Sequence, residues 1–224
     1  MCIRDRGQGQ FFSPRGLAVG SNGTVYVADF WNDRVQLFTS DGIFKSQWGS
    51  LSDQPGRFFA PVGVALDESG AIYVTDTWNN RVQKFDSRGQ VLKYWGGEGD
   101  GSGEFVRPHG IATDDVGNVF VCDTFNNRIQ KFSSEGMFLT SWTHAGLGEP
   151  ELIQPLAVAW ATEDRVYVTD GERGSFDRIT EYTGEGVFVR SWGASGSKQG
   201  ELDDARGIAI APDGSILVLS LIHI

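Results

Sequence analysis

Hydrophobic and polar positions alternate along the chain in short runs, and the runs come in sets of four. In the first set they span residues 16–19, 24–28, 34–39 and 43–48. Such short alternating runs predict β-strands, and no stretch shows the 3.6-residue period of a long amphipathic helix. No apolar run approaches the roughly 20 residues that a membrane-spanning helix needs. The pattern therefore predicts an all-β fold.

Turns that contain glycine separate the runs within each set. Glycine supplies the positive φ that tight hairpins demand, so these dipeptides mark hairpin turns. Between the first and second runs they are Asn22-Gly23, Ser69-Gly70, Val116-Gly117 and Asp213-Gly214, and between the third and fourth runs they are Asp41-Gly42, Arg88-Gly89, Glu135-Gly136 and Glu185-Gly186. Each set is therefore expected to form a meander of four antiparallel strands.

The sets repeat with a period of about 47 residues. Prolines keep this step at Pro14, Pro61, Pro108 and Pro155, and tryptophans at Trp48, Trp95, Trp142 and Trp192 step by 47, 47 and 50. A period of this length, filled with short strands, predicts a β-propeller in which each unit builds one blade. The units span about 7–53, 54–100, 101–147, 148–197 and 198–218, which gives four complete four-stranded blades and a partial, two-stranded fifth.

A polar, glycine-rich linker joins each unit to the next and ends in a large apolar residue. These residues are Phe11, Phe58, Phe105, Leu152 and Leu202. We expect each to fill the space between neighbouring blades. The glycine run from Gly97 to Gly103 belongs to such a linker and not to a phosphate-binding loop, because no helix and no Lys-Ser or Lys-Thr pair follows it.

The second unit carries a family resemblance. The run 61–66 (PVGVAL) followed by 71–85 (AIYVTDTWNNRVQKF) resembles an NHL repeat, and the pattern recurs at 29–38 and 123–132 and more loosely at 170–182. The resemblance implies a six-bladed propeller, of which this chain would form an open arc. It implies little about function, because the same blade serves unrelated activities.

The two ends of the chain match an inverted pair of nucleotide sequences. Residues 1–6 can be encoded by ATG TGT ATA AGA GAC AGG, and the reverse complement of this sequence encodes the Leu-Ser-Leu-Ile-His that begins at Leu219. Inverted ends of this kind resemble a transposon-end sequencing adapter read in frame. We therefore expect residues 1–6 and 219–224 to be adapter-derived and residues 7–218 to be a fragment of a longer protein. Its only cysteine would then be Cys122, which we expect to be buried and inert.

The acidic balance of the chain bears on its partners. Its net charge is −10, and without Arg4, Asp5 and Arg6 it is −11. Nucleic-acid binding depends on clustered Lys and Arg side chains that contact phosphates. Nucleic acid is therefore an unlikely partner, although some NHL domains bind RNA through a basic face.

An aspartate and an arginine five residues later recur in three units as Asp29/Arg34, Asp76/Arg81 and Asp123/Arg128, with Arg178 displaced by three residues in the fourth. A catalytic residue is normally needed once, whereas a bond that stabilises a blade is needed in every blade. We therefore interpret these pairs as structural.

The residue at the entrance to each innermost strand varies from unit to unit. These residues are Arg15, Val62, His109, Leu156 and Arg206. In a propeller they would surround one mouth of the central channel, which makes them candidate ligand-binding residues. The alternative is that each arginine only pairs with an aspartate of a neighbouring blade. The resemblance also includes the peptidyl-hydroxyglycine lyase branch of the family, in which histidines at Pro-His positions of several blades bind a metal ion. Here only His109 matches such a position, and one histidine is too few protein ligands for a zinc site.

A second candidate surface comes from the second loop of each unit. Trp31, Trp78 and Phe125 recur there, and the fourth unit replaces them with an insertion that contains Arg173. Exposed aromatic rings are good anchors for a partner. The alternative is that they pack on the adjacent linker, and that the insertion is tolerated loop variation.

The sequence favours a non-enzymatic binding or scaffold module that presents a propeller face to a protein, peptide or carbohydrate partner. A metal-dependent lyase or hydrolase resembling the peptidyl-hydroxyglycine lyases is the first alternative, and an RNA-binding NHL domain is the second. No cofactor and no metal site are predicted.

Overall fold

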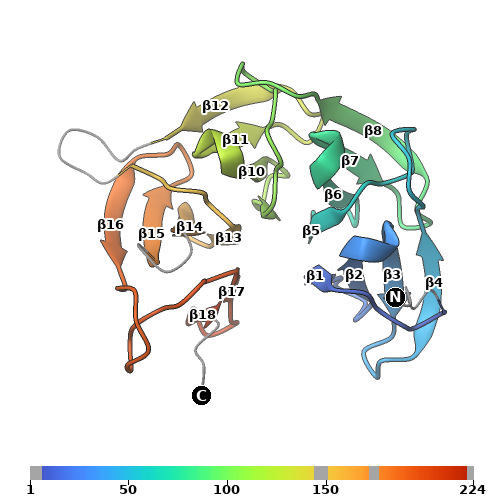
Figure 1. Ribbon diagram of the computed structural model, residues 1–224, viewed down its shortest axis with the longest axis horizontal. Helices are drawn as coiled ribbons and strands as arrows, with labels where there is room; N and C mark the ends of the chain where they lie inside the picture. The colour runs from blue at the N-terminus through green and yellow to red at the C-terminus, as the bar shows by residue number, and fades with distance from the viewer. Residues whose placement is uncertain (1–6, 144–150, 172–176, 221–224) are drawn as a thin grey trace, which may run out of the picture.

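The computed structural model describes residues 7–143, 151–171 and 177–220, which form an arc of antiparallel sheets around a common axis (Figure 1). Residues 1–6 and 221–224 lie outside the described residues, as do Arg173 and most of the insertion in the fourth unit. The expectations for those segments are therefore untested. No helix in the described part of the chain has the length and apolar character to cross a membrane.

Each of four blades is a four-stranded meander whose strands pair in chain order, and a two-stranded sheet follows them. The first blade contains β1 (Pro14–Val19), β2 (Val25–Asp29), β3 (Arg34–Phe38) and β4 (Phe44–Trp48). The second contains β5 (Pro61–Leu66), β6 (Ile72–Asp76), β7 (Arg81–Phe85) and β8 (Val91–Gly96). The third contains β9 (Ile111–Thr113), β10 (Val119–Asp123), β11 (Arg128–Phe132) and β12 (Phe138–Trp142). The fourth contains β13 (Ala157–Ala161), β14 (Arg165–Asp170), β15 (Arg178–Thr183) and β16 (Phe188–Trp192), and the last sheet contains β17 (Gly207–Ile210) and β18 (Ile216–Leu219).

This architecture confirms the all-β propeller expected from the repeat. In the first blade the strand ends fall within two residues of the expected runs. The sequence pattern did not reveal the single 3₁₀ turns that join the second and third strands, η1 (Phe30–Asn32), η2 (Thr77–Asn79) and η3 (Thr124–Asn126). They are too short to show a helical period.

Each 3₁₀ turn ends in a residue that links one blade to the next. Asp33, Asn80 and Asn127 adopt left-handed φ values of 55°, 51° and 53°, a conformation that Asn and Asp tolerate better than other side chains do. The Asn80 Oδ1 atom accepts a hydrogen bond from the backbone N–H of Arg107 in the next linker at 2.8 Å. Asp33 and Asn127 accept the equivalent bonds from the N–H groups of Ala60 and Gln154, both at 2.9 Å.

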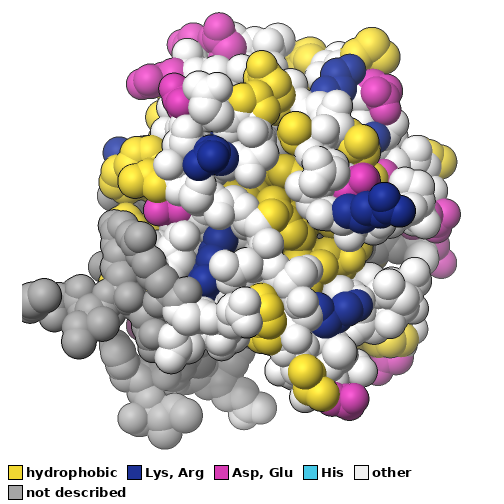
Figure 2. Space-filling model, turned by 90° about the vertical axis from the view of Figure 1, so that its right-hand side faces the viewer, with side chains coloured by type: hydrophobic (Ala, Val, Ile, Leu, Met, Phe, Trp, Pro, Cys, Tyr) yellow, Lys and Arg dark blue, Asp and Glu magenta, His cyan; other side chains and the backbone are white. Residues whose placement is uncertain are grey.

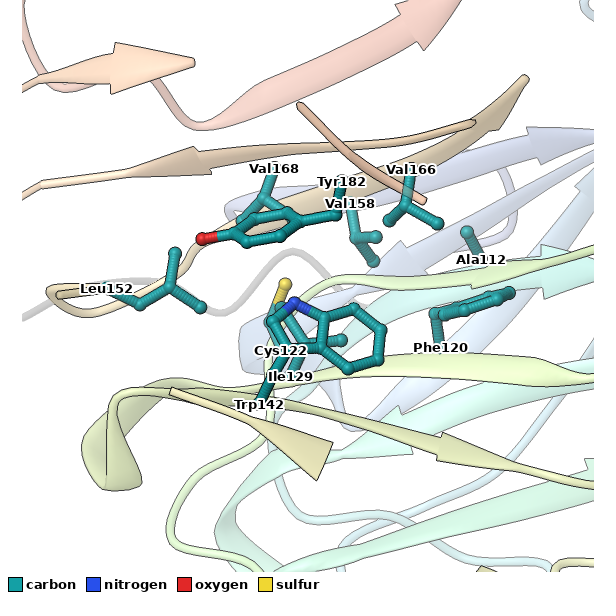
Figure 3. Close-up of a cluster of buried hydrophobic side chains, with 10 residues drawn as sticks. All are labelled: Ala112, Phe120, Cys122, Ile129, Trp142, Leu152, Val158, Val166, Val168 and Tyr182. Atoms are coloured by element: carbon teal, nitrogen blue, oxygen red, sulfur yellow. The ribbon is translucent and has the colours of Figure 1, made fainter. Parts of the chain in front are cut away.

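The hydrophobic core is divided among the interfaces between neighbouring blades. Figure 3 shows the cluster between the third and fourth blades, where Trp142 of one blade faces Tyr182 of the next, and Leu152 of the linker between them belongs to the same cluster. Phe58, Phe105 and Leu152 are at most 2% exposed, which confirms that these linker residues fill the space between blades. Phe11 is 37% exposed because no described blade precedes it.

The repeated tryptophans pack on glycines of the following blade. Trp48, at the end of β4, lies against Gly89 in the β7–β8 turn, and a Cβ atom added to that glycine would come within 2.7 Å of the indole ring. Trp95 faces Gly136 and Trp142 faces Gly186 in the same way. The outermost strand of one blade is thereby held against the last hairpin of the next.

The outer side and the two ends of the arc expose apolar side chains. Figure 2 shows the side of the first two blades, where hydrophobic side chains form a broken band among separate Lys, Arg, Asp and Glu side chains. At the first end of the arc, Leu17 and Val19 of β1 are 64% and 60% exposed, although Val64, the counterpart of Leu17 in the second blade, is 6% exposed. The other end exposes Leu217 and Leu219 of β18.

Candidate functional site

The repeated Asp and Arg side chains form buried networks within each blade. The Asp76 Oδ2 atom accepts hydrogen bonds from Asn79, Arg81 and Gln83, and its Oδ1 atom accepts one from the backbone N–H of Phe59 at 2.7 Å. Arg34–Asp29 at 2.8 Å and Arg128–Asp123 at 2.6 Å repeat the ion pair, and Arg178–Asp170 at 2.7 Å repeats it with the displaced arginine. The carboxylates are at most 2% exposed. The same buried Asp–Arg ion pair therefore occurs in each of the four four-stranded blades.

Glycines in the innermost strands position the residues at the channel mouth. Gly16 approaches the next blade so closely that a Cβ atom there would lie 2.3 Å from the carbonyl oxygen of Val62. Gly63 faces the carbonyl oxygen of His109 and Gly110 faces that of Leu156 in the same way, at 2.5 and 2.8 Å. Val62, His109 and Leu156 thus contact a glycine of the preceding blade through their backbone carbonyl groups, and these contacts do not involve their side chains.

Three of the five expected mouth residues line one pocket of about 210 Å³. We call it the channel-mouth pocket, and its lining residues are Arg15, Phe30, Val62, Trp78, Arg107, His109 and Phe125. Leu156 and Arg206 do not line it. Of the three expected aromatic residues, Trp78 and Phe125 line the pocket, whereas Trp31 lies outside it with its ring 6.1 Å from that of Trp78.

The aromatic residues both pack on the linker and remain accessible. The Trp78 ring lies 4.9 Å from the ring of the linker residue Phe59, and its backbone N–H donates to the Phe59 carbonyl at 3.0 Å. Trp78 is nevertheless 39% exposed and Phe125 is 48% exposed. The two interpretations offered by the sequence are therefore compatible.

Arg107 and Phe30 are pocket residues that the sequence analysis missed. Arg107 precedes Pro108 and has a left-handed φ of 50°. Its counterparts Ser13, Ala60 and Gln154 are also left-handed, with φ values of 58°, 55° and 45°. Its guanidinium carbon lies 5.0 Å from the centre of the Trp78 ring and 5.3 Å from that of Phe125, so the cation lies between two rings. The variation among these four counterparts was a signal that could have identified this position.

Phe30 stands where the second and third blades have a threonine. Thr77 and Thr124 each donate a hydrogen bond to a proline carbonyl of the next blade, at 2.7 and 2.8 Å. Phe30 has no hydroxyl, and its ring lies 4.8 Å below the guanidinium of Arg15. This departure from the repeat was also visible in the sequence.

The pocket is electropositive although the whole chain is acidic. Burial, and after it the charges of Arg15, Arg206 and Arg107, together lower the pKa of His109 to about 4. His109 is therefore neutral at neutral pH, and the positive potential comes from arginines. Burial and the nearby Arg206 also lower the pKa of Arg15, while Asp204 opposes them.

Arg206 differs from Arg15 in having an acidic partner. Its Nη2 atom lies 2.6 Å from the Oδ2 atom of Asp204. Asp204 belongs to the same sheet-forming unit, so this pair does not bridge two blades. Arg15 and Arg107 have no carboxylate within 4.0 Å among the described residues.

Residues that could hold a metal do not gather here. In residues 7–143, 151–171 and 177–220, no group of three or more His, Cys, Asp and Glu side chains is arranged to bind a metal ion. Cys122 is fully buried in the core between blades, and burial raises the pKa of its thiol well above the usual value. A thiol in this state is a poor nucleophile.

Comparison with known proteins agrees with the fold. The NHL repeat family matches residues 11–38, 60–85 and 105–132. A stretch of 42 residues is 45% identical to the Drosophila melanogaster protein brain tumor, covering 19% of this chain and 4% of that protein. The chain thus spans a small part of this curated relative.

Solved structures with the same architecture include several enzymes. A streptogramin B lyase matches 93% of this chain with a TM-score of 0.67 at 18% identity, and the chain covers 62% of it. The virginiamycin B lyase of Staphylococcus aureus matches with a TM-score of 0.66 at 16% identity, over 93% of this chain and 64% of that one. A gluconolactonase of Xanthomonas campestris matches with a TM-score of 0.70 at 16% identity, over 95% of this chain and 71% of that one.

Identities this low establish the architecture alone, and the repeat match adds the family. The chain is an NHL-repeat β-propeller.

Proposed function

We propose that this propeller is a non-enzymatic binding module whose channel-mouth pocket and adjoining aromatic rings contact a protein, peptide or carbohydrate partner. The observation that carries the proposal is the combination of exposed Trp78 and Phe125 rings with Arg15 and Arg107, which lie over aromatic rings and form no ion pair with a carboxylate in the described part of the chain. Aromatic and arginine side chains provide most of the binding energy at protein interfaces. Here a backbone fixed by contacts between blades holds them, so little conformational entropy would be lost on binding.

The proposal is tested by probing the whole chain against a peptide array, a glycan array and a pool of single-stranded RNA. Trp78→Ala and Phe125→Ala should abolish capture of the array partners. Val116→Ala is the matched control, because Val116 is 82% exposed and lies in the β9–β10 turn, at the opposite end of the strands. Partners captured equally well by all four proteins, or capture of RNA alone, would overturn the proposal.

A lyase or hydrolase is a second candidate function. Its support is His109, a neutral imidazole beside arginines that could stabilise an oxyanion, together with the enzymatic neighbours: one solved virginiamycin B lyase is described as catalytically inactive after a histidine was replaced by alanine. Turnover of a lactone or a cyclic depsipeptide by the chain that is lost in His109→Ala, while Trp78→Ala retains it, would favour this function over simple binding.

A further inference from the structure

Among the described residues, two arginines of the channel-mouth pocket lack the carboxylate partner that each buried blade arginine has. The blade arginines Arg34, Arg81 and Arg128 each form an ion pair of 2.8 Å or less. Arg15 and Arg107 instead lie over aromatic rings, at 4.8 Å from Phe30 and 5.0 Å from Trp78. A guanidinium over a ring keeps its in-plane N–H groups available to an acceptor. The chain has a net charge of −10, yet none of the described residues that line this pocket is an aspartate or a glutamate.

The size of the pocket limits what it can hold. Its volume of about 210 Å³ is below the roughly 300–1,000 Å³ of sites that enclose a drug-sized ligand. It would therefore accept the end of a longer molecule. Its walls are apolar rings and an aliphatic side chain from Phe30, Val62, Trp78 and Phe125, interrupted by Arg15, Arg107 and the imidazole of His109.

The chemistry of the walls favours a peptide over a sugar. Hydroxyl groups of a sugar need several acceptors and donors in fixed positions, which carboxylate and amide side chains supply. The described residues that line the pocket include no Asp, Glu, Asn or Gln side chain. An apolar amino-acid side chain would instead contact the rings of Trp78 and Phe125, with its carboxylate beside the arginines.

We propose that the channel-mouth pocket binds the C-terminal carboxylate of a peptide whose last side chain is apolar, with Arg15 and Arg107 as the carboxylate ligands. This inference rests on the proposed binding function and names its partner. The carboxylate would also offset the repulsion that Arg15, Arg107 and Arg206 exert on a protonated His109. Binding should therefore raise the pKa of His109, which gives a readout at the pocket itself.

The test uses the chain as it stands and three probes: N-acetyl-glycyl-glycyl-phenylalanine, its C-terminal amide, and glucuronic acid. Affinity is measured by calorimetry, and the His109 pKa is measured by NMR titration with the other two histidines of the chain as references. The free-acid peptide should bind at least about tenfold more tightly than the amide, as one charge-assisted hydrogen bond requires. It should raise the His109 pKa by a measurable step, and glucuronic acid should do neither.

Substitutions distinguish binding in the pocket from a general attraction between the peptide carboxylate and positive charge on the chain. Arg15→Gln and Arg107→Gln should each weaken binding of the free acid by roughly tenfold, and thermal unfolding would show that they stay folded. Arg88→Gln removes the same charge from an exposed turn between β7 and β8, away from the pocket, and should leave the affinity unchanged.

Each outcome decides between the two proposals. Equal binding of acid and amide, or stronger binding of glucuronic acid, would overturn the peptide-carboxylate inference but leave a binding face. If Trp78→Ala loses the array partners but none of the three probes binds to the wild type, the peptide-carboxylate inference is also overturned and the binding face again remains. Binding of the acid that persists in both arginine variants would overturn the assignment of the ligands.

Discussion

At the scale of single residues, the channel-mouth pocket combines a neutral histidine with charged arginines. The pKa of His109 is depressed first by burial of its ring and then by the charges of Arg15, Arg206 and Arg107, each on a different segment of the chain. The sequence placed His109 at the mouth, but it could not predict the protonation state, which depends on burial and on neighbours remote in sequence. Arg107, in contrast, could have been identified from the variation of the residue that precedes the repeated proline.

The depressed pKa of His109 predicts a specific loss of stability in mild acid. The unfolded chain binds a proton near pH 6.5, whereas the folded chain binds it only near pH 4. The unfolded state is therefore favoured as the pH falls through this window, by roughly 1 to 3 kcal/mol. Urea unfolding of the wild type and of His109→Gln at several pH values should show a smaller decrease for the variant. Parallel curves would contradict the depressed pKa.

The buried carboxylate of Asp76 should be needed for folding and not for one activity. Asp76→Ala leaves the Arg81 guanidinium buried without its carboxylate, which should cost about 3 to 5 kcal/mol in the free energy of unfolding. Asp53→Ala is the control, because Asp53 is exposed, and its change should stay within about 0.5 kcal/mol. An Asp76→Ala protein that kept wild-type stability but lost a binding partner would show that Asp76 has a role in binding.

At the scale of strands and turns, regular spacing allowed most of the fold to be predicted. Period-two runs and glycine turns located the strands of the first blade within two residues. The role of Trp95 was not predictable, because the glycine it contacts, Gly136, lies in the next blade. Local patterns describe an element, whereas contacts between blades depend on how two elements approach each other.

The contact between Trp95 and Gly136 predicts two separable penalties for alanine. Both Gly136 and Gly42 lie in the third turn of a blade, with φ values of 72° and 78°, but only at Gly136 does a neighbouring ring lie within 4 Å of an added Cβ atom. Gly42→Ala should cost about 1 kcal/mol from the left-handed backbone. Gly136→Ala should add roughly 1 to 3 kcal/mol from overpacking. Denaturant unfolding measures both, and equal losses would show that the indole ring moves aside.

At the scale of the whole molecule, the arc leaves apolar surface at both ends. Leu17 occupies the position of Val64, Ile111 and Val158, which are 6%, 7% and 6% exposed because another blade covers them. The arc was predicted because the family resemblance implies six blades and the sequence contains four complete units and a partial fifth. The sequence could not show how much apolar surface the ends retain.

These exposed ends should cause the chain to self-associate. Sedimentation velocity should show an average mass that rises with protein concentration, because contiguous exposed apolar surface favours association. A Leu17→Lys/Val19→Lys variant should reduce the effect, whereas Val116→Lys, in a turn away from the ends, should not. A concentration-independent monomer in the wild type would contradict this prediction.

The contacts of Gly16, Gly63 and Gly110 have a consequence for protein engineering. They hold neighbouring inner strands together through backbone atoms, so the spacing of positions 15, 62, 109 and 156 does not depend on which side chains occupy them. A combinatorial library randomised at these four positions, with the glycines kept, should therefore remain largely folded. The natural repeat would then provide a scaffold for selecting binders of chosen specificity.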